Sequence, residues 1–194
     1  METPEVEVSP GEDLMQEHGL IDRVLLVYDQ CSSLLISRKS LDLDVVIKAA
    51  DVIRRFGGGY HAKLEEEYIF PRLQERNLET PTVTTLVQQH QWATKITEAI
   101  LGRARVASNL ELFQLLQKFT TMYRPHTARE ETIIFPAFRT IVSPEEYEAL
   151  GELFEQKEKE QFGDNGFQEL VDEVSELERV LGIYDLSDFT PTST

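Results

Sequence analysis

The chain has 194 residues, of which 41% are hydrophobic and 28% are charged, and its formal net charge is −16. This length and composition allow one domain with a substantial hydrophobic core. An acidic surface repels nucleic-acid phosphates and anionic lipid headgroups, so we expect neither nucleic acid nor a membrane as a partner. No apolar run approaches the roughly 18 residues of a membrane span. The single cysteine, Cys31, excludes an intrachain disulfide and a cysteine-rich metal site.

Residues 1–11 lack the basic and apolar segments that make up a signal peptide. We expect them to form a flexible leader and the protein to be cytoplasmic. A periplasmic location stays open if a signal peptide has been removed.

Four long amphipathic helices are predicted next, because apolar residues recur every three or four positions and no alternating strand pattern competes. They span about residues 12–37, 41–76, 80–106 and 109–141. Capping residues mark the starts of the last two helices. Short loops between four such helices predict an all-α, up-down-up-down four-helix bundle, which we assign to residues 12–142.

Two more helices are predicted in residues 143–184. Ser143 and Pro144 provide a cap and a first-turn proline, and the Gly163–Gly166 segment separates the two helices. We expect an appended C-terminal helical hairpin that packs on the bundle. Residues 185–194 are expected to form a loose tail.

The most informative pattern is a phrase of the form HxxxEExxIFP that occurs twice. It runs from His61 to Pro71 and again from His126 to Pro136. A histidine and a glutamate four residues apart lie on the same face of a helix. Imidazole and carboxylate on one face can hold a first-row transition metal. Each copy therefore predicts part of a metal site.

All four histidines fall on the apolar stripes of different bundle helices. Buried carboxylates without a partner are costly, so a cation is the expected partner of the inward-pointing glutamates. We therefore predict two metal ions, each bound by two histidines, with both glutamates bridging them. The predicted ligands are His18, His61, Glu65 and Glu130 for one ion, and His90, His126 and the same two glutamates for the other.

Two segments conflict with a regular helix. Gly57–Gly59 and Pro125 each lie shortly before a repeat histidine, and both glycine and proline disfavour helix interiors. One interpretation is a tolerated irregularity. The other is a bend or π-bulge that aims His61 and His126 inward.

Asp22, Tyr60 and Tyr123 are candidates for contacts around the ligands. Asp22 can orient a ligand, and the tyrosines can donate a hydrogen bond or an electron to a bound oxidant. The competing interpretations are a surface acid for Asp22 and core packing for the tyrosines. We expect Glu66 and Glu131 not to be ligands, because the four-residue spacing favours the glutamates that precede them.

In these residues the chain resembles the hemerythrin family, also called the HHE cation-binding domain. The match extends from about Asp13 to Ile141, through His18, His90 and the two copies of the repeat. The resemblance implies a non-haem di-iron centre with an oxo or hydroxo bridge. Such a centre binds small oxidants: O₂, hydrogen peroxide or nitric oxide. Manganese or zinc also fits imidazole and carboxylate ligands.

The sequence departs from the oxygen-carrying hemerythrins, which supply a further histidine through HxxxH in the third helix. Here Thr94 lies four residues after His90, and Leu86 lies four before it. Their last motif ends in an aspartate five residues after the histidine, whereas this chain has Glu130 at four. With one histidine fewer, we expect an exchangeable position on both metals. This favours reaction with oxidants, including a catalase-like or peroxidase-like activity, over oxygen carriage alone.

Two other functions stay open. One is a non-enzymatic module for iron or oxygen sensing or for metal storage. The other is a purely structural bundle with titrating histidines. No phosphate-binding loop, dinucleotide fingerprint or HExxH motif occurs. The sequence does not decide between a monomer and a dimer.

Overall fold

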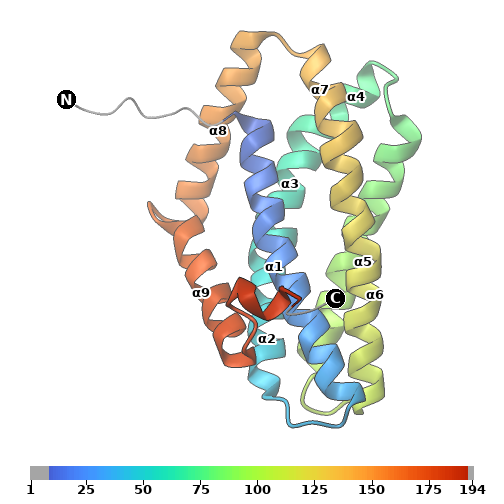
Figure 1. The fold of residues 1–194 in the computed structure, drawn as a ribbon. Helices are drawn as coiled ribbons and strands as arrows, with labels where there is room; N and C mark the ends of the chain where they lie inside the picture. The colour runs from blue at the N-terminus through green and yellow to red at the C-terminus, as the bar shows by residue number, and fades with distance from the viewer. Residues whose placement is uncertain (1–8, 192–194) are drawn as a thin grey trace, which may run out of the picture.

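The computed structural model describes residues 9–191, and these are helical with no strand (Figure 1). The predicted all-α class is confirmed. None of the described helices is long and apolar enough to cross a membrane. In chain order the α-helices are α1 (Pro10–Ile36), α2 (Leu43–Val52), α3 (Ala62–Leu64), α4 (Phe70–Glu75), α5 (Thr80–Arg103), α6 (Asn109–Arg129), α7 (Phe135–Ile141), α8 (Pro144–Phe162) and α9 (Gly166–Leu181).

Helices α1 to α7 build four long rods that lie side by side (Figure 1). Rod 1 is α1, rod 2 runs from α2 through α4, rod 3 is α5, and rod 4 runs from α6 through α7. Rods 1 and 3 each pack against rods 2 and 4. The apolar faces meet in one core, to which the rods contribute the fully buried Leu14, Phe56, Ile100 and Leu116. Each such side chain contributes roughly 1.5–3 kcal/mol by leaving water.

Helix α1 begins at Pro10, two residues before its predicted start. Ser9 is the cap: its hydroxyl accepts from the Glu12 N–H at 3.3 Å, and the Glu12 carboxylate accepts from the Ser9 N–H at 3.2 Å. This capping box satisfies N–H groups that the first turn would otherwise leave unpaired. Pro10 and Gly11 therefore belong to the helix and not to the expected leader. The earlier part of that leader lies outside the described residues.

Rod 2 contains a π-helix over Ile53–His61, which favours the π-bulge of the two interpretations of the glycine triplet. A Cβ at Gly59 would lie 2.9 Å from the carbonyl oxygen of Arg54, too close for any other residue without a shift. At Pro125 no π-bulge forms. Rod 4 stays α-helical through this exposed proline and beyond His126.

A second kind of π turn follows both repeat histidines. It covers Glu65–Ile69 in rod 2 and Glu130–Ile134 in rod 4. In each, the residue after the turn donates its N–H to the glutamate carbonyl five residues back. Pro71 and Pro136 come next, and neither has an N–H to continue the α-helical ladder, which favours the wider turn. The IFP ending of the motif thus helps to place the glutamates.

Helices α8 and α9 pack on each other and on rods 1 and 2 (Figure 1). Phe154 and Val174 are fully buried there. Arg23 of rod 1 pairs with Glu178 of α9. After α9 the chain forms a short, exposed 3₁₀ turn (Leu186–Phe189) within the expected loose tail, whose last three residues lie outside the described range.

Candidate metal centre

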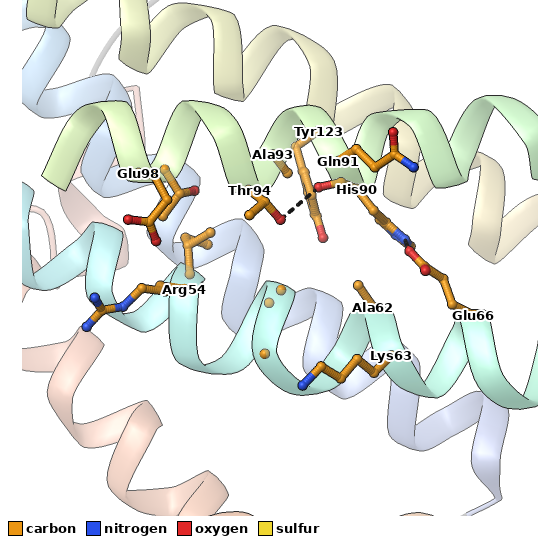
Figure 2. Close-up of a pocket in the computed structure, with 15 residues that line it drawn as sticks. Arg54, Ala62, Lys63, Glu66, His90, Gln91, Ala93, Thr94, Glu98 and Tyr123 are labelled. Atoms are coloured by element: carbon orange, nitrogen blue, oxygen red, sulfur yellow. Dashed lines mark hydrogen bonds and ion pairs between the residues drawn. The ribbon is translucent and has the colours of Figure 1, made fainter. Parts of the chain in front are cut away.

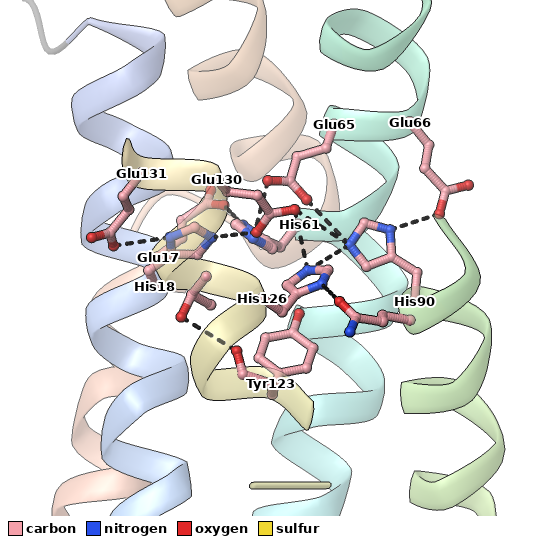
Figure 3. A network of polar contacts seen from close by, with 12 residues as sticks. Glu17, His18, His61, Glu65, Glu66, His90, Tyr123, His126, Glu130 and Glu131 are labelled. Atoms are coloured by element: carbon pink, nitrogen blue, oxygen red, sulfur yellow. Dashed lines mark hydrogen bonds and ion pairs between the residues drawn. The ribbon is translucent and has the colours of Figure 1, made fainter. Parts of the chain in front are cut away.

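The six predicted ligands meet in the middle of the bundle (Figure 3). Each is at most 5% exposed. They form two groups of four potential ligands, and within each group the ligand atoms lie within 4.8 Å of one another. Both glutamates belong to both groups. One group consists of His18, His61, Glu65 and Glu130, and the other of His90, His126, Glu65 and Glu130.

All four histidines turn Nε2 towards a glutamate. Across the rods, Nε2 of His18 lies 3.4 Å from Glu130 Oε2, and Nε2 of His90 lies 3.3 Å from Glu65 Oε2. Within a rod, Nε2 of His61 lies 3.7 Å from Glu65 Oε1, and Nε2 of His126 lies 3.1 Å from Glu130 Oε1. Glu65 and Glu130 therefore lie between the two histidine pairs, where bridging ligands would stand.

The centre leaves buried polar atoms without hydrogen bonds. They include both carboxylate oxygens of Glu65, both of Glu130, and Nε2 of His18 and His61. Leaving such atoms unpaired in a dry interior costs about 1–3 kcal/mol each, and more when they are charged. A cation bound by these atoms removes that cost, and imidazole and carboxylate suit a first-row transition metal. The donor set therefore fits a metal.

Each histidine also has an outer hydrogen-bond partner at Nδ1 (Figure 3). Such partners fix the ring orientation and the tautomer of a metal-binding histidine. The pairs are His18 with Glu131 at 3.0 Å, His61 with Glu17 at 2.5 Å, His90 with Glu66 at 2.8 Å and His126 with Gln89 at 2.9 Å.

The sequence analysis missed Glu17 and Gln89 and gave Glu66 and Glu131 no role. A usable signal was present. Glu17 and Gln89 each directly precede a histidine, and Glu66 and Glu131 each directly follow a predicted bridging glutamate. Because neighbours on a helix point about 100° apart, each of these side chains reaches the histidine of an adjacent rod.

The phenylalanines of the IFP motif cover the centre. Phe70 stacks on the His90 ring with centroids 5.9 Å apart, and Phe135 stacks on His18 at 5.5 Å. Both phenylalanines are buried. They exclude water from the histidines and so strengthen the electrostatic interactions of the glutamates.

In the metal-free protein, the histidines of rods 1 and 3 differ in protonation from those of rods 2 and 4. Burial lowers the pKa of His18 and His90, but the hydrogen bonds that the protonated rings donate to carboxylates outweigh it and raise the pKa to about 9 and about 10. Burial dominates for the other two: it lowers the pKa of His61 to about 4 and also lowers that of His126. One protonated imidazole in each pair therefore takes the place of a cation beside the glutamates.

The remaining candidates lie at different distances from the centre. Asp22 is exposed and lies outside the network in Figure 3. The Tyr60 hydroxyl donates to the carbonyl oxygen of Phe154 at 3.1 Å, and so ties rod 2 to α8. The Tyr123 ring lies 4.7 Å from the His126 ring and is buried. Only Tyr123 of the three contacts a predicted ligand.

Comparison with known proteins identifies the family of the chain. The family model described as "Hemerythrin HHE cation binding domain" matches residues 9–138. Uncharacterized proteins of Mycobacterium tuberculosis (strain H37Rv) and Mycobacterium bovis are each 39% identical to the chain, over 97% of its length and 76% of theirs. No solved structure gives a significant match. The chain belongs to the hemerythrin HHE cation-binding family.

Proposed function

We propose that the protein holds two iron ions in this centre and binds and reacts with small oxidants, namely O₂, hydrogen peroxide or nitric oxide. The observation that carries the proposal is the pair of buried glutamates with four unpaired oxygens between two histidine pairs. An oxo or hydroxo bridge between the ions is part of the proposal. So is the up-down-up-down order of the rods, which the short loops favour.

The ligand count favours reaction over oxygen carriage alone. Leu86 cannot bind a metal, and the Thr94 hydroxyl donates to the His90 carbonyl oxygen at 3.1 Å. Neither position supplies a further ligand, so an exchangeable position is left for a small molecule. When bound, the iron ions would supply electrons for the reduction of an oxidant at that position.

The chain's own residues hold this site in a fixed geometry. With a metal at Nε2, each Nδ1 keeps its proton and donates a hydrogen bond. The acceptors are Glu17, Glu66, Glu131 and Gln89. Phe70 and Phe135 keep bulk water off the rings. The protein therefore orients the donors and excludes solvent before any oxidant arrives.

Manganese or zinc can use the same donors, so metal identity decides between functions. The second candidate is a non-enzymatic module for metal storage or for iron or oxygen sensing. Complete burial of the glutamates favours it, because a shielded centre exchanges ligands slowly. We propose a cytoplasmic location, small-molecule partners, and no role for nucleic acid or membranes, on the basis of the acidic surface.

Metal analysis of protein made in iron-replete cells tests the proposal, with an optical spectrum before and after hydrogen peroxide. We expect two irons per chain and an oxo-bridge charge-transfer band that changes on oxidation. Iron bound without any reaction with peroxide would favour storage or sensing. One zinc, or no metal, would contradict the di-iron centre.

A further inference from the structure

The two metal-binding pairs are related by an internal repeat of the bundle. Placing His18 of rod 1 on His90 of rod 3 also places Leu14 on Leu86, and all four side chains are buried. The HxxxEExxIFP motif relates rod 2 to rod 4 in the same way. Corresponding positions in the two halves can therefore be compared directly.

In the two turns that follow His18 and His90, the corresponding side chains of rods 1 and 3 differ in size. Ile21 and Leu25 of rod 1 correspond to Ala93 and Thr97 of rod 3. All four are buried, so the smaller pair leaves space that the larger pair fills.

The partner rods differ in the same sense. The turn before His61 in rod 2 is Gly57–Gly59, whereas the turn before His126 in rod 4 carries Met122 and Tyr123. We call the interface between rods 2 and 3 the open side (Gly57–Gly59, Ala93, Thr97). We call the corresponding positions of rods 1 and 4 the closed side (Ile21, Leu25, Met122).

A pocket of about 400 Å³ occupies the open side (Figure 2). Its inner end is formed by the His90 ring and by Tyr123, and its walls by the glycine triplet, Ala93 and Thr97. A Cβ at Gly58 would lie 3.6 Å from Thr94 Oγ1 on the opposite wall. The pocket therefore reaches one predicted ligand, His90, from the surface.

The pocket wall carries a buried hydroxyl without a partner. Thr97 is 1% exposed, and its Oγ1 makes no hydrogen bond within the described part of the chain. A change of its χ1 rotamer, of which threonine has two in a helix, would let it donate to an oxygen of a bound molecule. At the mouth, Arg54 and Lys63 balance Glu66 and Glu98, so the pocket does not select a charged ligand.

We propose that this pocket binds a small neutral organic molecule with one hydrogen-bonding oxygen, of the class of short alkyl hydroperoxides and alcohols. It reaches the centre only from the open side. The volume is within the range of small-molecule sites, about 300–1,000 Å³, and far exceeds what a diatomic gas needs. The proposal rests on the proposed function for its metal. It replaces the expectation of an exchangeable position on both metals with such a position on one metal only.

Access to the pocket can be tested without metal. Ala93→Cys places a thiol on the open side, and Ile21→Cys places one at the corresponding closed position. In the metal-free protein we expect methyl methanethiosulfonate to label the first at least about tenfold faster than the second. Native Cys31 is fully buried and provides the unreactive background. Equal labelling rates for the two variants would overturn the asymmetry.

Ligand binding is tested in iron-loaded protein. We expect one azide per two irons, bound in competition with tert-butanol. The double variant Ala93→Ile with Thr97→Leu copies the closed side onto the open side, and should slow azide binding at least about tenfold at unchanged iron content. Thr97→Val is the matched control: it keeps the space, so the azide rate stays, but it removes the hydroxyl, so tert-butanol competes less well.

Two azides per chain, or an unchanged azide rate in the filled double variant, would contradict the proposal. If the double variant does not fold, Gly58→Leu at the exposed mouth gives the same test. Failure of the wild-type protein to bind iron would refute the proposed function but not the open pocket, because the cysteine labelling still reports on the pocket.

Discussion

The open and closed sides of the bundle share one metal-binding chemistry and differ in access. On both, a histidine of one rod faces a glutamate of the next, and the phenylalanine of the IFP motif covers the histidine ring. On the open side, small residues line a pocket that reaches a predicted ligand, whereas the corresponding residues of the closed side are larger. The comparison teaches that ligand positions and ligand access are set by different residues. A variant can therefore change access without changing the metal site.

The largest effect should come from removing a group that both halves share. Glu65→Gln removes a proposed ligand of both proposed metal positions, so we expect loss of most of the bound metal from both. Plasma emission analysis measures this. Glu67→Gln, two residues on and outside both ligand groups, is the matched control and should keep both metals. A Glu65→Gln protein that retains two irons would show that the glutamate does not bridge.

A smaller effect should follow from making the outer partners alike. His61 has the carboxylate of Glu17 where His126 has the amide of Gln89. Glu17→Gln should lower metal affinity about 10- to 100-fold, as other outer-partner changes do, through the His18/His61 position alone. Competition with a chelator measures it. Gln89→Glu should raise metal affinity at the His90/His126 position. Equal metal affinities of the two variants would show that the outer partners do not distinguish the two positions.

The pH dependence of the metal-free protein tests whether the halves match in charge. The pKa of His90 is about 10 in the folded protein, above its ordinary value of 6.5, so its stabilisation is complete below pH 6.5. It is lost as pH rises through about 10. We expect urea unfolding to become easier between pH 7 and pH 10. His90→Gln and the corresponding His18→Gln should each remove part of that dependence, and a change in only one of them would break the symmetry.

The smallest effect concerns the hairpin, which packs mainly on rods 1 and 2. Arg23→Gln removes the 2.5 Å contact to Glu178, whose side chain is 6% exposed. We expect a loss of about 1 kcal/mol in the free energy of unfolding, measured by urea denaturation, with iron content unchanged. Arg103→Gln, which breaks the exposed pair with Glu111, should cost less. Loss of iron in Arg23→Gln would show that the hairpin also shapes the centre.

The six candidate ligands could be predicted because helical periodicity alone orients them. Glu65 lies four residues after His61, and this places both on the inner face whatever the neighbouring rods do. The roles of Glu66 and Glu17 could not be predicted, because each contacts a histidine of another rod. The sequence left two interpretations open at Pro125, and in the structure the proline is exposed and the α-helix continues through it without a π-bulge.

The amino-acid sequence by itself determined the helical class, the two copies of the motif and the six inward side chains, since these depend on local spacing along single helices. Tertiary structure alone decided which outer partner meets which histidine, and which side of the bundle is open. Both depend on how one rod is turned against the next. The pocket in particular arises where the glycine triplet of rod 2 meets Ala93 and Thr97 of rod 3, and residues so far apart in the chain become neighbours only through packing.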